Sequence, residues 1–381
     1  MEKVNIKSAR PTFSEEEIEA ILKDCGQVLR SGRLILGPFA EEFEHLFRSY
    51  VGTPFAVSVN SCTTALQITL QYFDVKDKEV IVPTNTFLAT ANAVMYAGGQ
   101  PVFADIDDPW LSLSPESLSQ KITSRTKAVI LVHIGGMISP HLDEIKRICR
   151  SKGLLLIEDA AHAHGAKFAD HLAGNLSDAA CFSFYPTKVM TTTVGGMITT
   201  HDQGLDSFAR SMRHHGQTDR TLDVLTRFGN DWLLDEMRAV IGIHQTKQLE
   251  AMVTRRNQLA ARYCERLRDL ELVQCIPVPN HIRHAYYKFL VLLDKRVDRD
   301  KLVSRLNEHH GIEAGALYYP PCHLQPVIKQ TFQTKDGDLP VSEEVLQREV
   351  CFPMHLQLTE DDVDRVAEAL RRELGSFVGR P

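Results

Sequence analysis

Short apolar runs alternate with longer amphipathic segments along most of the chain. Runs such as 56–59 (AVSV), 79–83 (EVIVP) and 128–132 (AVILV) predict buried strands. Between them, segments such as 142–152 place apolar residues three and four positions apart and end at a glycine, which predicts helices. This alternation predicts an α/β fold in which a mostly parallel sheet carries helices on both faces.

The pattern changes toward the C-terminus. A long amphipathic helix is predicted from Gln248, followed by a strand near 284–293, a capped helix near 298–311 and a final strand and helix. Strands and helices in this order predict a smaller α+β domain. We therefore expect a large domain at 1–247, including an N-terminal arm, and a small C-terminal domain at 248–381.

The first fifty residues are predicted to form the N-terminal arm. Ser14 and the three acidic residues after it match the N-cap and first turn of a helix. Apolar residues then recur at helical spacing, at Ile18, Ile21, Leu22 and Leu29, and form one stripe along that helix.

The stretch from Leu154 to Thr200 carries the candidate chemistry. Its first apolar run predicts a strand that ends at Glu158 and Asp159 and is followed by a turn. Its second apolar run ends shortly before Lys188. Open α/β sheets keep their chemistry at such strand ends. An acid and a lysine there form the pair that a pyridoxal 5'-phosphate (PLP) site requires, the lysine as Schiff base and the acid against the pyridinium nitrogen. Taken separately, each residue is more often a solvated lysine or a turn residue.

A polar turn supplies a candidate phosphate site. Residues 61–64 (SCTT) follow the strand at 56–59 and open a helix, so their backbone N–H groups and hydroxyls would face an anion at the helix N-terminus. The alternative is that this quartet only caps the helix.

Composition excludes several other classes of protein. A chain of 381 residues with 43% apolar and 24% charged residues is ordinary for a globular protein with a large and a smaller domain. The net charge of −6 gives no electrostatic footprint for nucleic acid. No GxGxxG follows a strand and no GxxxxGK is present, which argues against a dinucleotide or P-loop site. The eight cysteines form no CxxC pair, so we interpret them as buried thiols rather than as a disulfide framework or a zinc site.

The sequence also bears on location. It has no apolar run of about 18 residues, and its first residues lack the apolar core of a signal peptide. We expect a cytoplasmic protein that binds neither membranes nor nucleic acid.

The motif EDAAHAHGA at 158–166, followed by FSFYPTK at 182–188 and GGM at 195–197, resembles the signature of the DegT/StrS-type sugar aminotransferases. The resemblance implies the fold type I of PLP aminotransferases and a homodimer with shared active sites. It also implies transfer of an amino group from an amino acid, usually glutamate or glutamine, to a keto sugar carried on a nucleotide. Further segments extend the likeness over nearly the whole chain: 31–44, 214–216, 236–239, 317–327 and 352–355.

The resemblance implies roles for individual residues. Lys188 would hold PLP as a Schiff base and transfer protons, and Asp159 would face the ring nitrogen. Phe87 would stack on the pyridine ring, and His162 would lie beside its phenolic oxygen. The phosphate would be anchored by Ser61, Cys62, Thr63 and Ser183, while His215, Asn230 and Trp232 would reach the site of the neighbouring subunit.

Some positions depart from the usual pattern of the family. The family usually has GlyTyrAsnTyrArg where this chain has Gly229 to Leu233, and direct alignment puts Asp231 on the phosphate, where a second anion is unfavourable. Either Asn230 takes that role or the contact is lost. His162 stands where glutamine is common, and Val194 replaces an acidic residue.

Two alternative functions therefore stay open. One is a PLP-dependent sugar dehydratase or isomerase on the same scaffold; family members that dehydrate sugars have histidine in place of the lysine, so Lys188 argues against it. The other is a PLP-binding regulatory protein without turnover, for which the changes at Asp231, Leu233 and Val194 are the motive.

Overall fold

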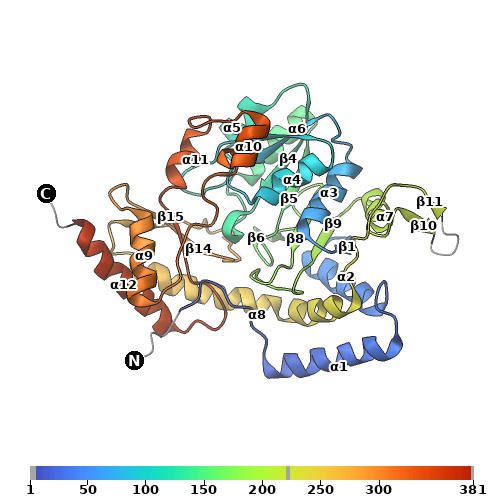
Figure 1. The fold of residues 1–381 in the computed structure, drawn as a ribbon, viewed down its shortest axis with the longest axis horizontal. Coiled ribbons are helices and arrows are strands. Elements are labelled where there is room, and N and C mark those ends of the chain that lie inside the picture. The colour runs from blue at the N-terminus through green and yellow to red at the C-terminus, as the bar shows by residue number, and fades with distance from the viewer. Residues whose placement is uncertain (1–5, 220–223, 379–381) are drawn as a thin grey trace.

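The computed structural model describes residues 6–219 and 224–378. Its centre is a seven-stranded sheet with the strand order β1-β9-β8-β5-β4-β2-β3 (Figure 1). Within this sheet β9 runs antiparallel to β1 and β8, and the other pairs are parallel, which confirms the mostly parallel sheet. The strands are β1 (Phe55–Val59), β2 (Glu79–Pro83), β3 (Gln100–Ala104), β4 (Thr126–Val132), β5 (Leu155–Asp159), β8 (Ala179–Ser183) and β9 (Gly196–Thr200).

Helices cover both faces of this sheet because side chains of each strand alternate between two cores. In β4, Val129 and Leu131 belong to one core, while Ala128 and Ile130 belong to the other. The same alternation sends Glu158 and Asp159 at the end of β5 to opposite faces. One face carries α3 (Cys62–Tyr72), α4 (Leu88–Tyr96) and α7 (Gln203–Met212); the other carries α2 (Pro38–Val51), α5 (Pro115–Lys121), α6 (Leu142–Lys152) and the first half of α8 (Glu236–Leu267).

A smaller antiparallel sheet lies toward the C-terminus, with the order β12-β14-β15. Its core includes Phe289 and Val350, packed against Tyr263 in the second half of α8. This part has the α+β character predicted for it. Its elements are β12 (Val273–Cys275), β14 (Phe289–Leu293), β15 (Glu349–Phe352), α9 (Arg299–His310) and α12 (Glu360–Val378).

Helix α8 begins earlier than the sequence predicted. It starts at Glu236, where the side chain of Asp235 accepts a hydrogen bond from the Arg238 amide, and not at Gln248. The first half of α8 packs closely on α2: a Cβ at Gly242 would lie 2.6 Å from Phe43. This packing stabilises the helix over residues 236–247, where the sequence pattern did not predict one. The predicted boundary between 247 and 248 falls inside this continuous helix (Figure 1), and the division into two domains remains a prediction.

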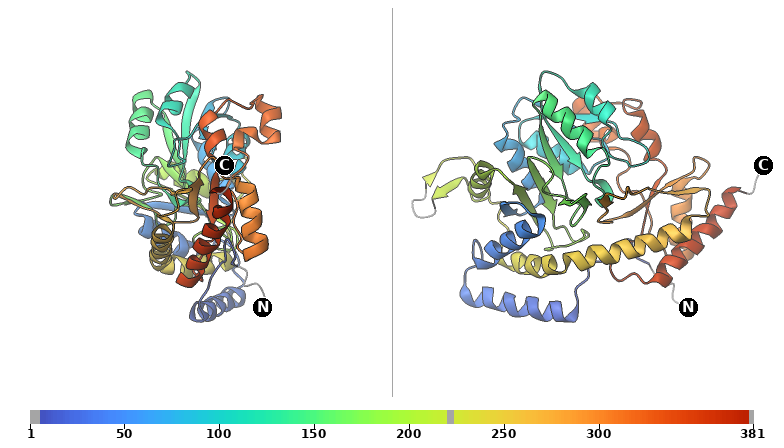
Figure 2. Two further views of the ribbon diagram at one scale, coloured as in Figure 1. Left: turned by 90° about the vertical axis from the view of Figure 1, so that its left-hand side faces the viewer. Right: turned by 180° about the vertical axis from the view of Figure 1, so that it is seen from behind.

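Helix α1 (Glu15–Ser31) lies along α8 (Figure 2). Its predicted apolar stripe is largely uncovered, since Leu22 and Leu29 are 66% and 63% exposed. The contacts with α8 include a hydrogen bond from Gln245 to Glu17 of 2.7 Å. None of the helices that the structure describes combines the length and apolar character that a membrane span needs.

The remaining elements are short. A hairpin of β10 (Gln217–Asp219) and β11 (Val224–Leu225) projects from the molecule (Figure 1). The others are β6 (Lys167–Phe168), β7 (His171–Leu172), β13 (Ile282–Arg283), α10 (Pro326–Phe332), α11 (Pro340–Val345) and two 3₁₀ turns, Ile134–Gly136 and Cys322–Leu324.

Candidate active site

The carboxyl ends of the parallel strands enclose a cavity of about 470 Å³. The residues predicted for the chain's own site line it, whereas His215, Asn230 and Trp232, predicted for the neighbouring subunit's site, do not. The lining residues are Ser61, Cys62, Thr63, Phe87, Asp159, His162, Ser183 and Lys188. They come from the last residues of β5 and β8, from the turn and helix start that follow β1, and from the loops after β2, β5 and β8, so the sheet itself brings these distant parts of the sequence together.

Lys188 lies in the loop after β8. Its backbone N–H donates to the carbonyl of Tyr185 (2.9 Å), and its Nζ lies 4.6 Å from the centroid of the Tyr287 ring. Burial lowers the pKa of Lys188 to about 8, against the opposing effects of Asp159 and Cys62. The free amine, which is the nucleophilic form, is therefore far better populated near neutral pH than in a solvated lysine.

Asp159 forms one wall of the cavity. Its Oδ2 accepts a hydrogen bond from Thr90 (2.8 Å), and its Oδ1 accepts one from the Ala161 amide (3.2 Å). Burial raises the pKa of this carboxyl, while these hydrogen bonds and Lys188 act in the opposite direction. A buried carboxylate held in this way favours the binding of a cationic group against it.

The predicted phosphate turn forms the start of α3, and Ser61 serves as its N-cap. Ser61 Oγ accepts a hydrogen bond from the Thr64 amide (3.1 Å) and lies 3.0 Å from Thr64 Oγ1. Because Thr64 donates its own proton to Asn60 (2.7 Å), the Ser61 hydroxyl donates to Thr64 and is used locally. The first N–H groups of α3 and the hydroxyls of Thr63 and Ser183 are the groups best placed for an anion.

Gly196 allows β9 to pass close to this turn. A Cβ at that position would lie 2.4 Å from the Ser61 carbonyl oxygen and 2.7 Å from the Cys62 amide nitrogen. No residue with a Cβ fits at such distances, so the turn can lie this close to β9 only because the second residue of the GlyGly pair has no side chain.

Aromatic rings form the rest of the cavity wall. His162 stacks on Tyr287 with ring centroids 4.3 Å apart, and its Nε2 lies 3.0 Å from the Tyr318 hydroxyl. Burial lowers the pKa of His162, so the imidazole is neutral, and its buried Nδ1 has no partner among the described residues. Phe87 is the N-cap residue of α4 and is 60% exposed, which places its ring at the cavity rim and not in the core.

Sequence reasoning did not single out Tyr287 and Tyr318. Each is one of a pair of adjacent tyrosines, and each lies in a segment that follows the central sheet in the chain. The family resemblance brought 317–327 near the substrate, but no periodicity distinguishes Tyr318 from Tyr319 in such a loop.

The segment around Asn230 lies outside the cavity of its own chain. Asn230 and Asp231 are exposed, and Asn230 Oδ1 accepts a hydrogen bond from the Asp231 amide (2.8 Å). The carbonyl of Trp232 accepts one from the Asn60 amide (2.9 Å), so the segment runs beside the end of β1. Residues 220–223 of this predicted loop lie outside the described residues. Val194, the other notable departure, does line the cavity.

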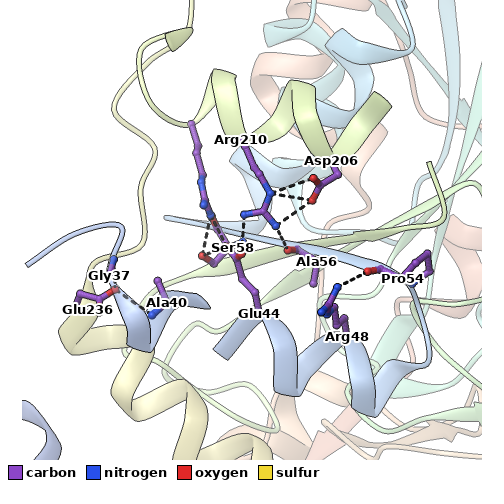
Figure 3. A network of polar contacts seen from close by, with 11 residues as sticks. Gly37, Ala40, Glu44, Arg48, Pro54, Ala56, Ser58, Asp206, Arg210 and Glu236 are labelled. Carbon is purple, nitrogen blue, oxygen red and sulfur yellow. Dashed lines mark hydrogen bonds and ion pairs between the residues drawn. The ribbon is translucent and has the colours of Figure 1, made fainter. Parts of the chain in front are cut away.

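A second cavity, of about 480 Å³, lies between α2 and α7. Two arginines of this cavity are paired with carboxylates of the chain: Arg210 donates to Glu44 Oε2 (2.8 Å) and to Asp206 (Figure 3), and Arg213 donates to Glu44 and to the Ser58 carbonyl. This network joins α2, β1 and α7. Since this cavity has no lysine beside a carboxylate, we place the chemistry in the first one.

Comparisons with known proteins point to one family. The model of the DegT/DnrJ/EryC1/StrS aminotransferase family matches residues 15–371. UDP-N-acetyl-3-dehydro-α-D-glucosamine 3-aminotransferase of Acidithiobacillus ferrooxidans is 36% identical over 361 residues, which cover 93% of this chain and 94% of that protein. The dTDP-3-amino-3,4,6-trideoxy-α-D-glucose transaminase of Micromonospora megalomicea subsp. nigra is 33% identical over 362 residues, with 94% and 95% covered. The crystal structure of S. venezuelae DesV in complex with a ketimine intermediate superposes with a TM-score of 0.89 at 31% identity, with 98% of this chain and 100% of that chain covered.

Proposed function

Since the chain belongs to the DegT/DnrJ/EryC1/StrS aminotransferase family, we propose that it transfers an amino group from glutamate or glutamine to a keto sugar carried on a nucleotide. Aminotransferase activity and PLP as cofactor follow from the family. The nucleotide linkage is supported by two relatives that are named for UDP- and dTDP-linked sugars. The observation that carries the proposal is the convergence of Lys188 and Asp159 on one cavity.

The residues of the cavity fit PLP group by group. Lys188 offers an amine for the aldehyde, and Asp159 offers a carboxylate for the ring nitrogen. The start of α3 suits the phosphate, and the unpartnered Nδ1 of His162 is a polar atom that a bound oxygen would satisfy. Phe87 offers an aromatic face at the rim. We infer that these residues hold the cofactor.

When bound, PLP supplies an electron sink for the carbon that carries the amino group. Lys188, as a free amine, takes the proton from the Cα atom of the donor and returns a proton in the opposite half-reaction. The carboxylate of Asp159 keeps a proton on the facing ring nitrogen, because an anion stabilises the protonated form of its neighbour. The rings of Phe87 and Tyr318, with centroids 5.7 Å apart, both line the cavity.

The two alternative functions differ in turnover. A dehydratase or isomerase would give no net transfer of nitrogen from the donor, and a regulatory protein would bind PLP without consuming a donor. The presence of Lys188 at the cavity wall supports transamination over dehydration. A spectroscopic donor half-reaction, in which an amino acid converts the aldehyde form of the cofactor to the amine form, separates the three.

We expect Lys188 to be the residue that carries the cofactor. Borohydride reduction of the holoenzyme should fix PLP to the peptide that contains Lys188. The variant Lys188→Ala should lose transamination by more than the roughly 10² to 10⁴-fold that loss of a general base costs, because the anchor is removed as well. Mass spectrometry of the reduced protein reads the site; a label on any other lysine would contradict the assignment.

The acceptor can be found with the amine form of the enzyme. Candidate keto sugars, each tested free and as its UDP- or dTDP-linked form, should be screened for return of the aldehyde form by absorbance. The proposal expects return only with a nucleotide-linked sugar. Equal rates with the free sugar would remove the nucleotide from the proposal, and leave the sugar aminotransferase in place.

We further propose that two copies form a homodimer with shared active sites. Asn230 is exposed and lies outside the cavity of its own chain, where it serves no cofactor. The apolar stripe of α1 and the fully exposed Phe228, which follows the projecting hairpin, are surfaces that a second copy would cover.

A further inference from the structure

Two lysines touch one aromatic ring beside the cavity. The Nζ atoms of Lys188 and Lys288 lie 4.6 Å and 5.3 Å from the centroid of the Tyr287 ring, so they are no further apart than the sum of these distances. The ring is fixed on both sides of this contact: the Tyr287 hydroxyl lies 3.1 Å from Thr187 Oγ1, and the Lys288 amide donates to the Gly135 carbonyl (3.1 Å).

The groups that face Lys188 come from several elements. Asp159 at the end of β5 and Cys62 at the start of α3 favour its charged form, and Lys288 disfavours it. His162 and His164 also lie near, but burial lowers the pKa of both, so they are neutral and add no charge near pH 7. Among the described residues, Lys288 is thus the cation that opposes Asp159.

Lys288 itself is surrounded by titratable and charged groups of several elements. Burial lowers the pKa of Lys288 and Arg256 of α8 acts in the same direction, while Cys351 of β15 and Glu313 act in the opposite direction. Glu313 is engaged elsewhere, since it accepts hydrogen bonds from Lys7 (2.6 Å) and from the Ser8 amide (3.1 Å). Within the described residues no carboxylate lies within ion-pair distance of Lys288 Nζ, so its field is not cancelled locally.

We propose that Lys288 is a positioning residue of the reaction: its charge, held against the ring that Lys188 also contacts, adds to burial in disfavouring the ammonium form of Lys188 and so raises the population of the free amine. The inference rests on the proposed role of Lys188. The charge of Lys288 adds to burial, which lowers the pKa of Lys188 against the Asp159 carboxylate that favours a proton on the lysine. A second cation next to a catalytic lysine is a known way to free its amine.

The effect is measurable in the full-length, cofactor-free protein. The rate at which acetic anhydride modifies Lys188, followed by mass spectrometry as a function of pH, reports the midpoint at which the amine becomes free. Lys288→Gln should raise this midpoint by roughly one pH unit, as expected for two charges about 10 Å or less apart at an effective dielectric constant near 20. Lys288→Arg, which keeps the charge, should leave the midpoint close to its original value.

Matched variants separate this effect from a structural one. Lys295→Gln removes the same charge from an exposed lysine at the other end of β14 and should leave the midpoint unchanged. Lys288→Met repeats the loss of charge with a different side chain. The proposal is overturned if the midpoint stays in place in both neutral variants, or if Lys288→Arg moves it as far as they do. It is also overturned if the neutral variants raise only the KM for a substrate, which would make Lys288 a substrate ligand.

Failure of the proposed function gives a different result. If borohydride fixes the cofactor to another lysine, the role of Lys188 in the reaction is lost and the inference falls with it, even if the midpoint moves. If Lys188 carries the label and the midpoint does not move, transamination by Lys188 stands and Lys288 has no part in it.

Discussion

Two adjacent acids at the end of β5 have different surroundings because side chains of a strand alternate. Asp159 faces the cavity, whereas Glu158 is fully buried on the other side and does not line it. Glu158 lies 2.9 Å from His133 Nε2 and accepts hydrogen bonds from the amides of Gly174 (2.8 Å) and Leu176 (2.9 Å). The first residue serves the site and the second ties the following loop to the sheet.

These surroundings predict opposite defects. Asp159→Asn should leave the fold and cofactor attachment largely intact but slow proton transfer by about 10²-fold or more, because a neutral partner no longer keeps the ring nitrogen protonated. Single-turnover kinetics of the donor half-reaction measure this. Glu158→Gln should slow that step far less and instead lower the free energy of unfolding by about 1 to 3 kcal/mol, since buried donors lose their partner. Full activity of the Asp159→Asn variant would exclude the role given to it.

The phosphate residues should also separate into two groups. Thr63→Val and Ser183→Ala each remove a hydroxyl that faces the cavity, and each should weaken PLP binding by about 1.5 to 3 kcal/mol, as for a hydrogen bond to a charged oxygen. Ser61→Ala should cost about 1 kcal/mol of stability instead, because Ser61 caps α3 with its hydroxyl. Equilibrium dialysis of PLP and thermal unfolding measure the two effects. An unchanged dissociation constant in the Thr63→Val/Ser183→Ala double variant would leave both residues without a part in cofactor binding.

At the scale of elements, α2 is anchored at its start and in its middle by carboxylates. Glu236 of α8 accepts hydrogen bonds from the amides of Gly37 (2.9 Å) and Ala40 (3.0 Å) at the first turn of α2 (Figure 3). Glu44 lies further along α2 and is buried. Burial disfavours the ionised form of its carboxyl, but the guanidinium of Arg213 beside it helps to hold the pKa of Glu44 below the usual range. Both contacts hold α2 against the sheet from segments distant in sequence.

Loss of Glu44 should therefore be costly. Glu44→Ala leaves the buried Arg213 without its ion-pair partner, which should lower the free energy of unfolding by about 3 to 5 kcal/mol. Arg210→Ala removes a partner whose side chain is 40% exposed, and the expected loss is only about 1 kcal/mol or less. Urea unfolding of the two single variants and the double variant gives both values. Equal losses in the two single variants would contradict the reasoning from burial.

Elements whose ends are marked by capping or turn residues could be predicted from the sequence, and elements that depend on tertiary packing could not. Helix α6 ends at Gly153 in the left-handed conformation, as its glycine indicated, and α3 starts at the predicted polar turn. The predicted start of α8 was wrong because packing against α2 stabilises the first half of this helix, and the local pattern of polar residues does not reveal that packing. In α1 the helix was predicted, but its periodicity could not say that Leu22 and Leu29 would lack a cover within one chain.

At the scale of the molecule, the sequence predicted the fold class and most of the cavity because strand ends are visible locally and the sheet brings them together. The family comparisons confirm the fold class. Tyr287 and Tyr318, which line the cavity, and Lys288 beside Tyr287 were not foreseen, since their segments approach the site only through the packing of the smaller sheet against the central one. Asn230, which was assigned to the site of a neighbouring subunit, does not line the cavity of its own chain.

The proposed shared site predicts complementation between two poorly active variants. Lys188→Ala and Asn230→Ala subunits should each be poorly active alone, one through loss of the anchor and the other through loss of a contact to the cofactor phosphate in the neighbouring subunit. After mixing and subunit exchange, one site of each heterodimer combines both defects and the other has neither, so activity should return to as much as one intact site per dimer.

If Asn230→Ala alone is fully active, the same cross with Trp232→Ala tests the segment independently of the phosphate contact. Mass spectrometry of differently tagged subunits verifies exchange. Lys188→Ala mixed with Asp159→Asn serves as a reference: both residues belong to the same chain's cavity, so each site of the heterodimer keeps one defect and no intact site should appear. Mixtures of Lys188→Ala with the Asn230 and Trp232 variants that stay as inactive as their parents despite proven exchange, or a fully active monomer, would mean that each chain builds its own site.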